Sequence, residues 1–282
     1  MAGNMLDPRI VRVGIEVQGK LRLYEGLWVT VQVQKFCNPL QNEAQIQIAN
    51  LSKEVRDYIL TETSPYNRMR SRKRCVIYAG RESFGVSQIY SGDIYEASIT
   101  QPPDIVLTLK CKTGWALKGS MVGYGLPSVS SLSDIAKQTS VAVGMPLQFE
   151  ATEKNVSNFN YTGSAAKSVD ALHGLGGIDA YIDDDKLIVK DKNKALNNTD
   201  NVLSLDTGLI GIPEPTDQGV KIKYLFDPYS KLGGQITLKS QLNPALSGKY
   251  IIYQLTYELA SRDTPFYCIV ACRRQGFRYG LY

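Results

Sequence analysis

Apolar and polar residues alternate along several stretches before about residue 112. The alternation is clearest over residues 29–34 and 105–112. Because successive side chains of a strand point to opposite faces, this period of two predicts strands that bury one face. Residues 52–61 instead place apolar side chains at helical spacing behind Ser52, a residue type that caps helix N-termini. We therefore expect a first domain, residues 1–112, in which one helix plugs or flanks a β-barrel.

The pattern changes between residues 113 and 199, where helix and strand signals alternate. The run from Ser131 to Asp134 is typical of a capping box that opens a helix, and a second helix is predicted from near Ser164 to a group of glycines. Residues 180–190 then predict a hairpin around three consecutive aspartates, which we interpret as a solvated turn. These signals predict a small α/β insert that ends in an asparagine-rich linker.

Residues 200–282 return to a period of two, clearest over residues 220–224 and 251–259. The two outer sections are thus both strand-dominated, and we expect them to fold as similar β-barrels. The predicted fold class is mainly β, with two β-barrel domains, residues 1–112 and 200–282, flanking a small α+β domain.

Composition and charge fit a folded protein of 282 residues with 43% apolar and 21% charged residues. The net charge of +5 is mild for this length, so a polyanion partner is not implied. The cysteines, 5 in number, fall mostly in apolar stretches, which predicts core thiols and a reducing compartment during folding. No apolar run reaches the roughly 18 residues that span a bilayer, and the N-terminus lacks the features of a signal peptide. We expect folding in the cytoplasm.

Residues suited to catalysis or metal binding are sparse. His173 is the only histidine, and its place at the end of a predicted helix favours a structural role. Cys268 and Cys272 share one face of a predicted strand, but no second pair of ligands completes a zinc site. The aspartates 183–185 lack the alternate spacing of a calcium loop. We expect no catalytic residues, no metal and no cofactor.

One basic cluster stands out between the first helix and the strand that follows it. Its cations are Arg68, Arg70, Arg72, Lys73 and Arg74. The cluster could be a loop that contacts an acidic protein surface or DNA. It could equally be a solvated edge ahead of an apolar strand. Both interpretations stay open on the sequence alone.

Several short motifs follow one another along the chain in an order typical of one family. The positions that carry them are Asn42, Asn50, Leu51, Ser52, Gly80, Gly92, Gly208, Gly211, Pro213 and Gly219. In this order and spacing the chain resembles the baseplate (tail) hub proteins of contractile-tailed bacteriophages, the Mu-like or late control protein D-like hubs. It departs from many relatives at residues 257–263, where a different sequence replaces a His-Ser-Gly-Asp-like turn.

The resemblance implies a homotrimer in which each subunit contributes two tail-tube-like β-barrels to a pseudo-sixfold ring. Such a ring would join the tail tube protein above to a separate spike protein below, contact other baseplate proteins, and leave a channel for the genomic DNA. The implied location is the virion tail baseplate, assembled in the bacterial host cytoplasm.

Two other functions remain open at this stage. The first is a strand-rich nucleic-acid-binding module that uses the basic segment 68–74. The second is a tail-associated cell-wall hydrolase, against which the missing catalytic signatures argue. A salt-dependent DNA titration separates the first from a hub.

Overall fold

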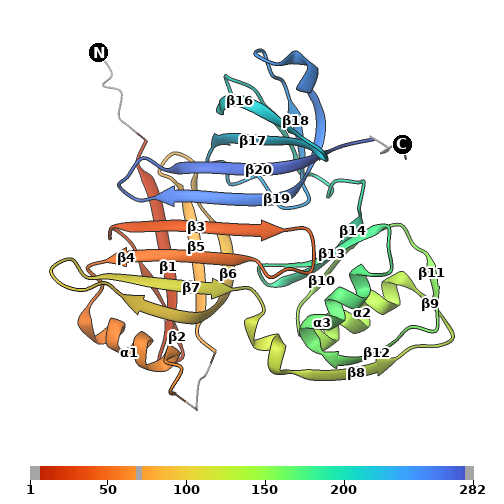
Figure 1. The fold of residues 1–282 in the computed structure, drawn as a ribbon, viewed down its shortest axis with the longest axis horizontal. Helices are drawn as coiled ribbons and strands as arrows, with labels where there is room; N and C mark the ends of the chain where they lie inside the picture. The colour runs from red at the N-terminus through yellow and green to blue at the C-terminus, as the bar shows by residue number, and fades with distance from the viewer. Residues whose placement is uncertain (1–6, 68–71, 277–282) are drawn as a thin grey trace.

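The computed structural model describes residues 7–67 and 72–276, and strands dominate it (Figure 1). The first section contains one helix, α1 (Lys53–Thr63). Its strands are β1 (Arg9–Val17), β2 (Lys20–Tyr24), β3 (Val29–Phe36), β4 (Glu43–Ala49), β5 (Arg74–Arg81), β6 (Gly85–Ile99) and β7 (Val106–Lys112). The predicted helix is confirmed: Ser52 is its N-cap residue, and Val55 and Ile59 are buried against the core.

The insert combines two helices, α2 (Leu132–Val143) and α3 (Ala165–His173), with short strands. The strands are β8 (Met121–Gly125), β9 (Val129–Ser131), β10 (Leu147–Glu150), β11 (Asn155–Ser157), β12 (Asn160–Ser164), β13 (Ile178–Asp183) and β14 (Lys186–Asp191), preceded by the 3₁₀ turn η1 (Trp115–Gly119). As the capping box predicts, the Ser131 hydroxyl accepts a hydrogen bond from the Asp134 amide, 3.1 Å away. The predicted hairpin is the antiparallel pair β13 and β14.

The last section holds the remaining strands. They are β15 (Asp200–Leu203), β16 (Leu209–Thr216), β17 (Gly219–Leu225), β18 (Gln235–Leu238), β19 (Gly248–Ala260) and β20 (Phe266–Arg274), with the 3₁₀ turn η2 (Pro244–Leu246). β19 is long enough to have two neighbours along the same edge: β18 pairs with its first residues and β3 with residues 254–260. That second pairing joins the first section to the last.

The described strands of both outer sections therefore form one 13-stranded sheet. Its main path runs β16-β17-β20-β19-β3-β4-β7-β6-β5-β1-β2 and does not return on itself within the described part of the chain. The mainly β class is confirmed, but the two closed barrels that we predicted are not found. Alternation predicts which residues form strands, whereas the pairing of β3 with β19 depends on residues more than two hundred positions apart.

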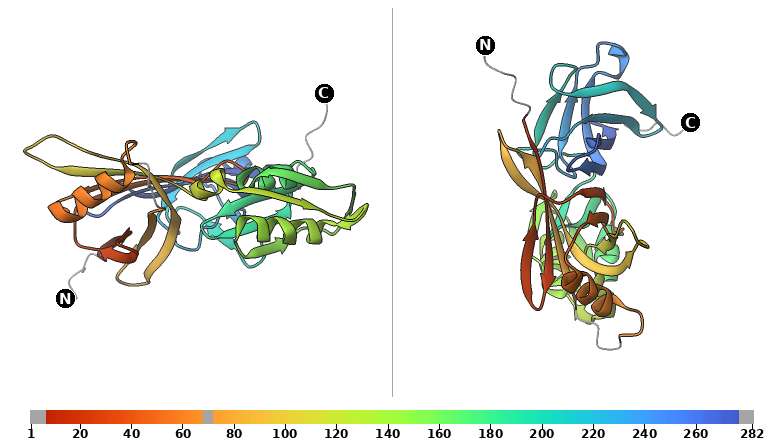
Figure 2. Two further views of the ribbon diagram at one scale, coloured as in Figure 1. Left: turned by 90° about the horizontal axis from the view of Figure 1, so that it is seen from below. Right: turned by 90° about the vertical axis from the view of Figure 1, so that its left-hand side faces the viewer.

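The long strand β6 turns the sheet back over itself. Its first half pairs with β5 and its second half with β7. Figure 2 shows the result as two layers, with β1 and β2 on the side opposite β7 and with α1 between the layers at one end. The apolar side chains between the layers form one core that includes residues of both outer sections, while the insert has a smaller core of its own.

We call one layer the front sheet: β16, β17, β20, β19, β3, β4, β7 and residues 94–99 of β6, in that order. One of its faces packs on the core, as the buried Val29, Val31 and Val33 of β3 show. The other face is turned toward the viewer in Figure 1 and is not covered by another layer. No helix in the described ranges is long and apolar enough to cross a membrane.

Candidate functional site: the hairpin that joins the sections

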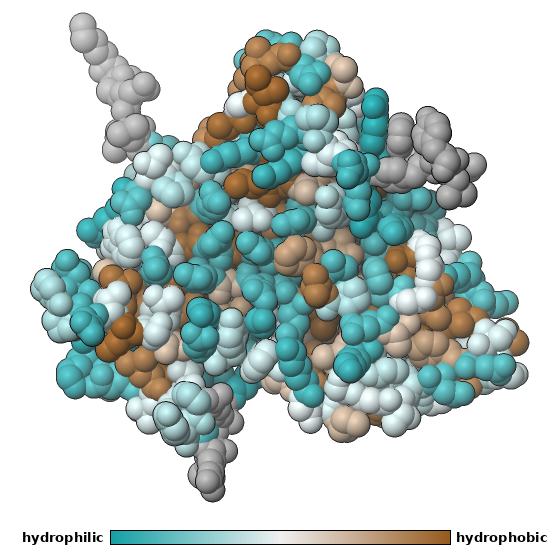
Figure 3. Space-filling model, viewed as in Figure 1, coloured by the Kyte–Doolittle hydropathy of each residue, from teal (hydrophilic) through white to brown (hydrophobic). Residues whose placement is uncertain are grey.

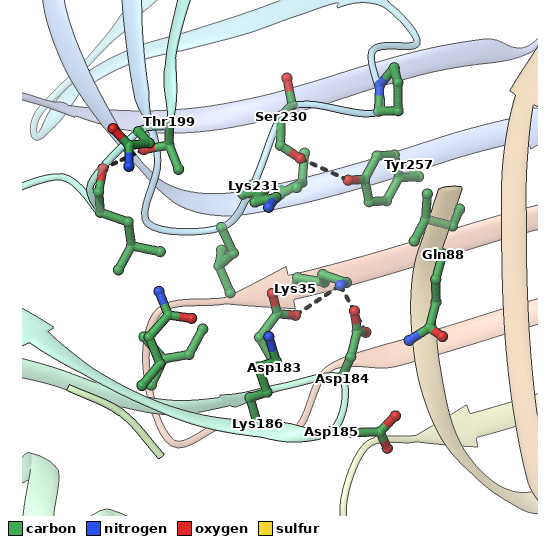
Figure 4. Close-up of a pocket in the computed structure, with 18 of the residues that line it drawn as sticks. Lys35, Gln88, Asp183, Asp184, Asp185, Lys186, Thr199, Ser230, Lys231 and Tyr257 are labelled. Carbon is green, nitrogen blue, oxygen red and sulfur yellow. Dashed lines mark hydrogen bonds and ion pairs between the residues drawn. The ribbon is translucent and has the colours of Figure 1, made fainter. Parts of the chain in front are cut away.

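The β13–β14 hairpin of the insert reaches the first section through its acidic tip (Figure 4). The Lys35 ammonium lies 2.8 Å from an Asp183 carboxylate oxygen and 2.9 Å from one of Asp184. Lys35 is only 4% exposed, because it occupies a core-facing position of β3. The prediction that this acidic turn is simply solvated is therefore wrong. A buried cation, which the sequence pattern does not pair with any partner, draws the carboxylates inward.

Asn42, one of the family motif positions, fixes the same hairpin from the β3–β4 connection. Its side chain is fully buried, and its Oδ1 accepts a hydrogen bond from the Phe36 amide at 3.0 Å. Its Nδ2 donates to the Ile182 carbonyl at 3.1 Å and to the Asp183 carboxylate at 3.2 Å. One amide thus satisfies polar groups of both the first section and the insert.

The outer part of the tip is held by β5 and β6. The Ser91 amide donates to the Asp184 carboxylate at 3.0 Å, and the Ser91 hydroxyl donates to Asp185 at 3.3 Å. Arg74 forms an ion pair with Asp185. Four polar residues of the first section, Lys35, Asn42, Arg74 and Ser91, therefore contact the three aspartates.

The base of the hairpin contacts the last section. Asp179 and Lys190, each 1% exposed, form an ion pair at 3.2 Å. The Arg273 guanidinium of β20 lies 3.2 Å from the same Asp179 carboxylate. The Tyr181 hydroxyl donates to the Leu232 carbonyl at 3.2 Å. The hairpin thus holds the first section with its tip and the last section with its base.

A polar cavity of about 440 Å³ lies beside the tip, between the hairpin and the last section. Figure 4 shows Lys35, Asp183 and Asp184 on one side and Ser230, Lys231 and Tyr257 on the other. Its carboxylates are already bound to Lys35 and Ser91. Across the described residues, no group of three or more His, Cys, Asp or Glu side chains could hold a metal ion. The contacts of these carboxylates join the hairpin tip to the first section.

Burial and neighbouring charges shift the pKa values of Lys35 and Asp184 at the hairpin tip. Burial opposes the charge of Lys35, but the carboxylates of Asp183 and Asp184 outweigh it and raise the pKa of Lys35. Burial raises the pKa of Asp184 to about 6; the Asp183 carboxylate adds to this rise, and Lys35 opposes it.

We expect the junction to respond to pH through Asp184. The folded protein binds this proton more tightly than the unfolded chain. The resulting stabilisation of the fold is complete at pH values below 3.8, the ordinary pKa of an aspartate, and is lost as pH rises through about 6. Thermal unfolding of the wild type and of Asp184→Asn should show the variant gaining stability relative to the wild type between acid and neutral pH. A difference that does not change with pH contradicts the assignment.

The described cations of the basic cluster form ion pairs with carboxylates of the same chain. Arg68 and Arg70 lie outside the described residues. Arg72 forms an ion pair with Asp93, Lys73 lies 3.0 Å from Glu62, and Arg74 pairs with Asp185 as described above. Contact of this cluster with a partner protein stays a prediction.

The other motif positions lie at turns and close approaches of the backbone. Asn50 has a positive φ of 60°, Leu51 is buried, and Ser52 precedes α1. Gly80 and Gly92 lie in β5 and β6, Gly208 precedes β16, Gly211 and Pro213 lie in β16, and Gly219 begins β17. A Cβ atom on Gly219 would lie 2.3 Å from the Cys272 carbonyl oxygen, so only glycine fits at this point of the β17–β20 pairing.

The sole histidine and the cysteines take structural positions. His173 ends α3, and its Nδ1 accepts a hydrogen bond from the Ala180 amide at 3.1 Å. Burial lowers the pKa of His173, which favours this neutral acceptor form. All five cysteines are free and buried, as predicted, and burial raises the pKa of Cys37 and of Cys268 to about 12.

Comparisons with known proteins agree with the fold. The 43 kDa tail protein of prophage MuSo2 from Shewanella oneidensis superposes with a TM-score of 0.62 at 8% identity, covering 94% of this chain and 98% of that one. A tail protein from Neisseria meningitidis gives 0.65 at 9% identity, covering 94% and 97%. An E. coli component of the type VI secretion system, described as structurally similar to the T4 bacteriophage tail proteins gp27 and gp5, gives 0.60 at 11%, covering 95% and 78%.

Sequence comparison identifies the family directly. No curated protein sequence matches the chain. The family model described as Baseplate hub gp41, however, matches residues 10–272, which is nearly the whole length. The protein therefore belongs to the Baseplate hub gp41 family of phage tail proteins.

Proposed function

We propose that three copies of this protein form the hub ring of a phage baseplate, between the tail tube protein and a separate spike protein. Membership of a baseplate hub family supports a place in the virion tail. The ring would be assembled in the host cytoplasm and would leave a channel for the genomic DNA. Residues 1–112, 113–199 and 200–282 would be the three domains of each copy.

The observation that carries the proposal is the front sheet with its two free edges. The sheet crosses both outer sections without interruption because β3 pairs with β19. At one end, β16 has β17 as its only strand neighbour among the described residues. At the other end, residues 95–99 of β6 pair with β7 alone within those same described ranges. Two unlike edges at opposite ends suit a head-to-tail contact, which gives a ring when the rotation between copies closes.

The size of the front sheet suits three copies around DNA. Its eight strands per copy would bring roughly 24 strands into the ring. At a strand spacing of about 4.8 Å, such a ring measures about 37 Å between backbones. Side chains occupy roughly 5 Å on each side, half the distance between packed sheets. The remaining opening exceeds the width of a DNA duplex, roughly 20 Å.

Exposed apolar side chains gather toward the ends of the front sheet. Ile212 of β16 is 61% exposed and Leu225 of β17 is 47% exposed. Ile99, at the end of β6, is 48% exposed. Burying exposed apolar side chains against a partner stabilises the complex, so these positions support contact between copies at both edges.

The ring can be tested with one substitution at the β16 edge. We expect Ile212→Lys to shift the purified protein from trimer toward monomer in light scattering, because a lysine charge would be desolvated in the contact. Leu40→Lys is the matched control, since Leu40 is 62% exposed on the β3–β4 connection, away from both edges. A wild type that stays monomeric at high concentration, or equal behaviour of the two variants, contradicts this ring.

We further propose that the protein has no catalytic activity of its own and that segment 68–74 contacts other baseplate proteins. The two alternatives from the sequence gain no support here. The visible cations of the basic cluster are paired with carboxylates, which weakens the case for a nucleic-acid site there. The sole histidine, His173, already accepts a hydrogen bond at Nδ1 from the Ala180 amide.

A further inference from the structure

The uncovered face of the front sheet is rich in amides and hydroxyls near its centre. The side chains there are Thr30, Gln32 and Gln34 on β3 and Gln45 and Gln47 on β4. They alternate with the buried valines and isoleucines of the same strands. Figure 3 views this face and shows mostly hydrophilic residues across its middle.

Three lysines of this face form ion pairs with glutamates on neighbouring strands. Lys112 of β7 lies 2.7 Å from Glu43 of β4. Lys110 of β7 lies 2.8 Å from Glu96 of β6. Near the other end, Lys221 of β17 lies 3.9 Å from Glu214 of β16. Each lysine faces its glutamate directly in the strand register.

Two further charged residues, Lys223 and Glu258, lie on this face. The Lys223 ammonium lies 4.3 Å from the centre of the Tyr267 ring, and Glu258 lies on β19 between Gln32 and Tyr267. These strands therefore place four carboxylates and four ammonium groups on the face. The Arg273 guanidinium of β20, on the same side of its strand as Tyr267, is paired with Asp179 of the insert. A surface of this kind has little net field of its own.

The middle of the face also lacks the features of a protein contact. Among the described residues, no large apolar side chain of β3, β4 or β7 is markedly exposed; the exposed Ile212, Leu225 and Ile99 lie toward the ends of the sheet. Protein interfaces usually centre on aromatic or aliphatic anchors. The centre of the face is instead suited to contact with water.

We propose that this face is the channel wall, and that its paired charges keep it from holding the DNA duplex that passes along it. The inference rests on the proposed hub function. Unpaired lysines would bind phosphates by releasing counterions, and unpaired glutamates would repel them. Cross-strand pairing removes both effects while the amides keep the wall hydrated.

The glutamates are thus the residues that prevent DNA binding, and removing them is the test. The face variant carries Glu43→Gln, Glu96→Gln and Glu214→Gln, which frees Lys112, Lys110 and Lys221. The control variant makes the same change in net charge elsewhere, through Glu25→Gln, Asp57→Asn and Asp134→Asn. These three acids pair with Arg12, Lys53 and Lys137, away from the front sheet.

Binding of a labelled DNA duplex is measured for the purified full chain by fluorescence anisotropy. We expect the face variant to bind, while the wild type and the control variant do not. With about three phosphate contacts, the affinity of the face variant should fall about 40-fold between roughly 50 and 200 mM salt. Firm binding by the wild type, or equal binding by the face and control variants, overturns the proposal.

Light scattering on the same samples separates this inference from the ring. If the face variant binds DNA but the wild type never forms a trimer, the hub proposal fails while the charge pairing keeps its measured effect. If the wild type is trimeric and binds duplex tightly, the ring stands and the neutral wall is wrong.

Discussion

Replacing Asp179 by alanine is expected to lower the free energy of unfolding by about 3–5 kcal/mol. The Lys190 ammonium is 1% exposed and 3.2 Å from Asp179, so the variant leaves a buried cation without its counter-ion. The carbonyl groups of Asp191 and Lys194 still accept hydrogen bonds from it, but they carry no formal charge to balance it. Chemical denaturation of wild type and variant measures the difference.

Two controls separate this charge effect from a general loss of packing. The double variant Asp179→Leu with Lys190→Met removes both charges and should recover much of the stability, because apolar replacements of a buried pair are often neutral. Asp57→Ala removes a pair whose side chains are 81% and 55% exposed and should change stability by less than about 0.5 kcal/mol. A double variant as unstable as Asp179→Ala argues for lost packing instead.

Replacing Asn42 by alanine is expected to loosen the hairpin tip as well as to destabilise the fold. The change leaves the Phe36 amide and the Ile182 carbonyl without the partner that satisfies them now. Each unsatisfied buried group costs about 1–3 kcal/mol, so we expect a loss of about 2–5 kcal/mol. Hydrogen exchange should increase at residues 182–185 more than in the α2 helix.

The matched control is Asn155→Ala, at an exposed position in the short strand β11. It should leave both stability and exchange near wild-type values. Faster exchange spread evenly over the whole insert would mean that Asn42 supports general packing and does not specifically hold the tip.

Local features of the fold could be predicted from the sequence because neighbouring residues determine them. Alternating residues gave the strands β3, β4 and β19, and capping residues located the helices at Ser131 and Ser164. Strand pairing could not be predicted in this way. Which edges meet depends on irregularities in β6 and β19, where the strand register shifts, and no local sequence pattern predicts these.

The junction was harder to predict than the strands. Lys35 follows Val29, Val31 and Val33 on the core-facing side of β3, a position from which a buried cation could have been predicted. Its partners lie 148 and 149 residues later, in an acidic turn that looks solvated when read alone. Asn42 was found through the family resemblance, but its role required the contact with Ile182.

The pairing of β3 with β19 also sets an order of events during synthesis. Val29 donates a hydrogen bond to Ser261, 232 residues further along the chain. A growing chain on the ribosome therefore holds β3 with one edge unpaired until almost all of the protein has emerged. Closing such a long loop is slow, and an exposed edge can pair wrongly in the meantime. The continuous front sheet, whose two edges would meet neighbouring copies, is thus completed last, so an unfinished subunit does not yet hold both edges in one sheet.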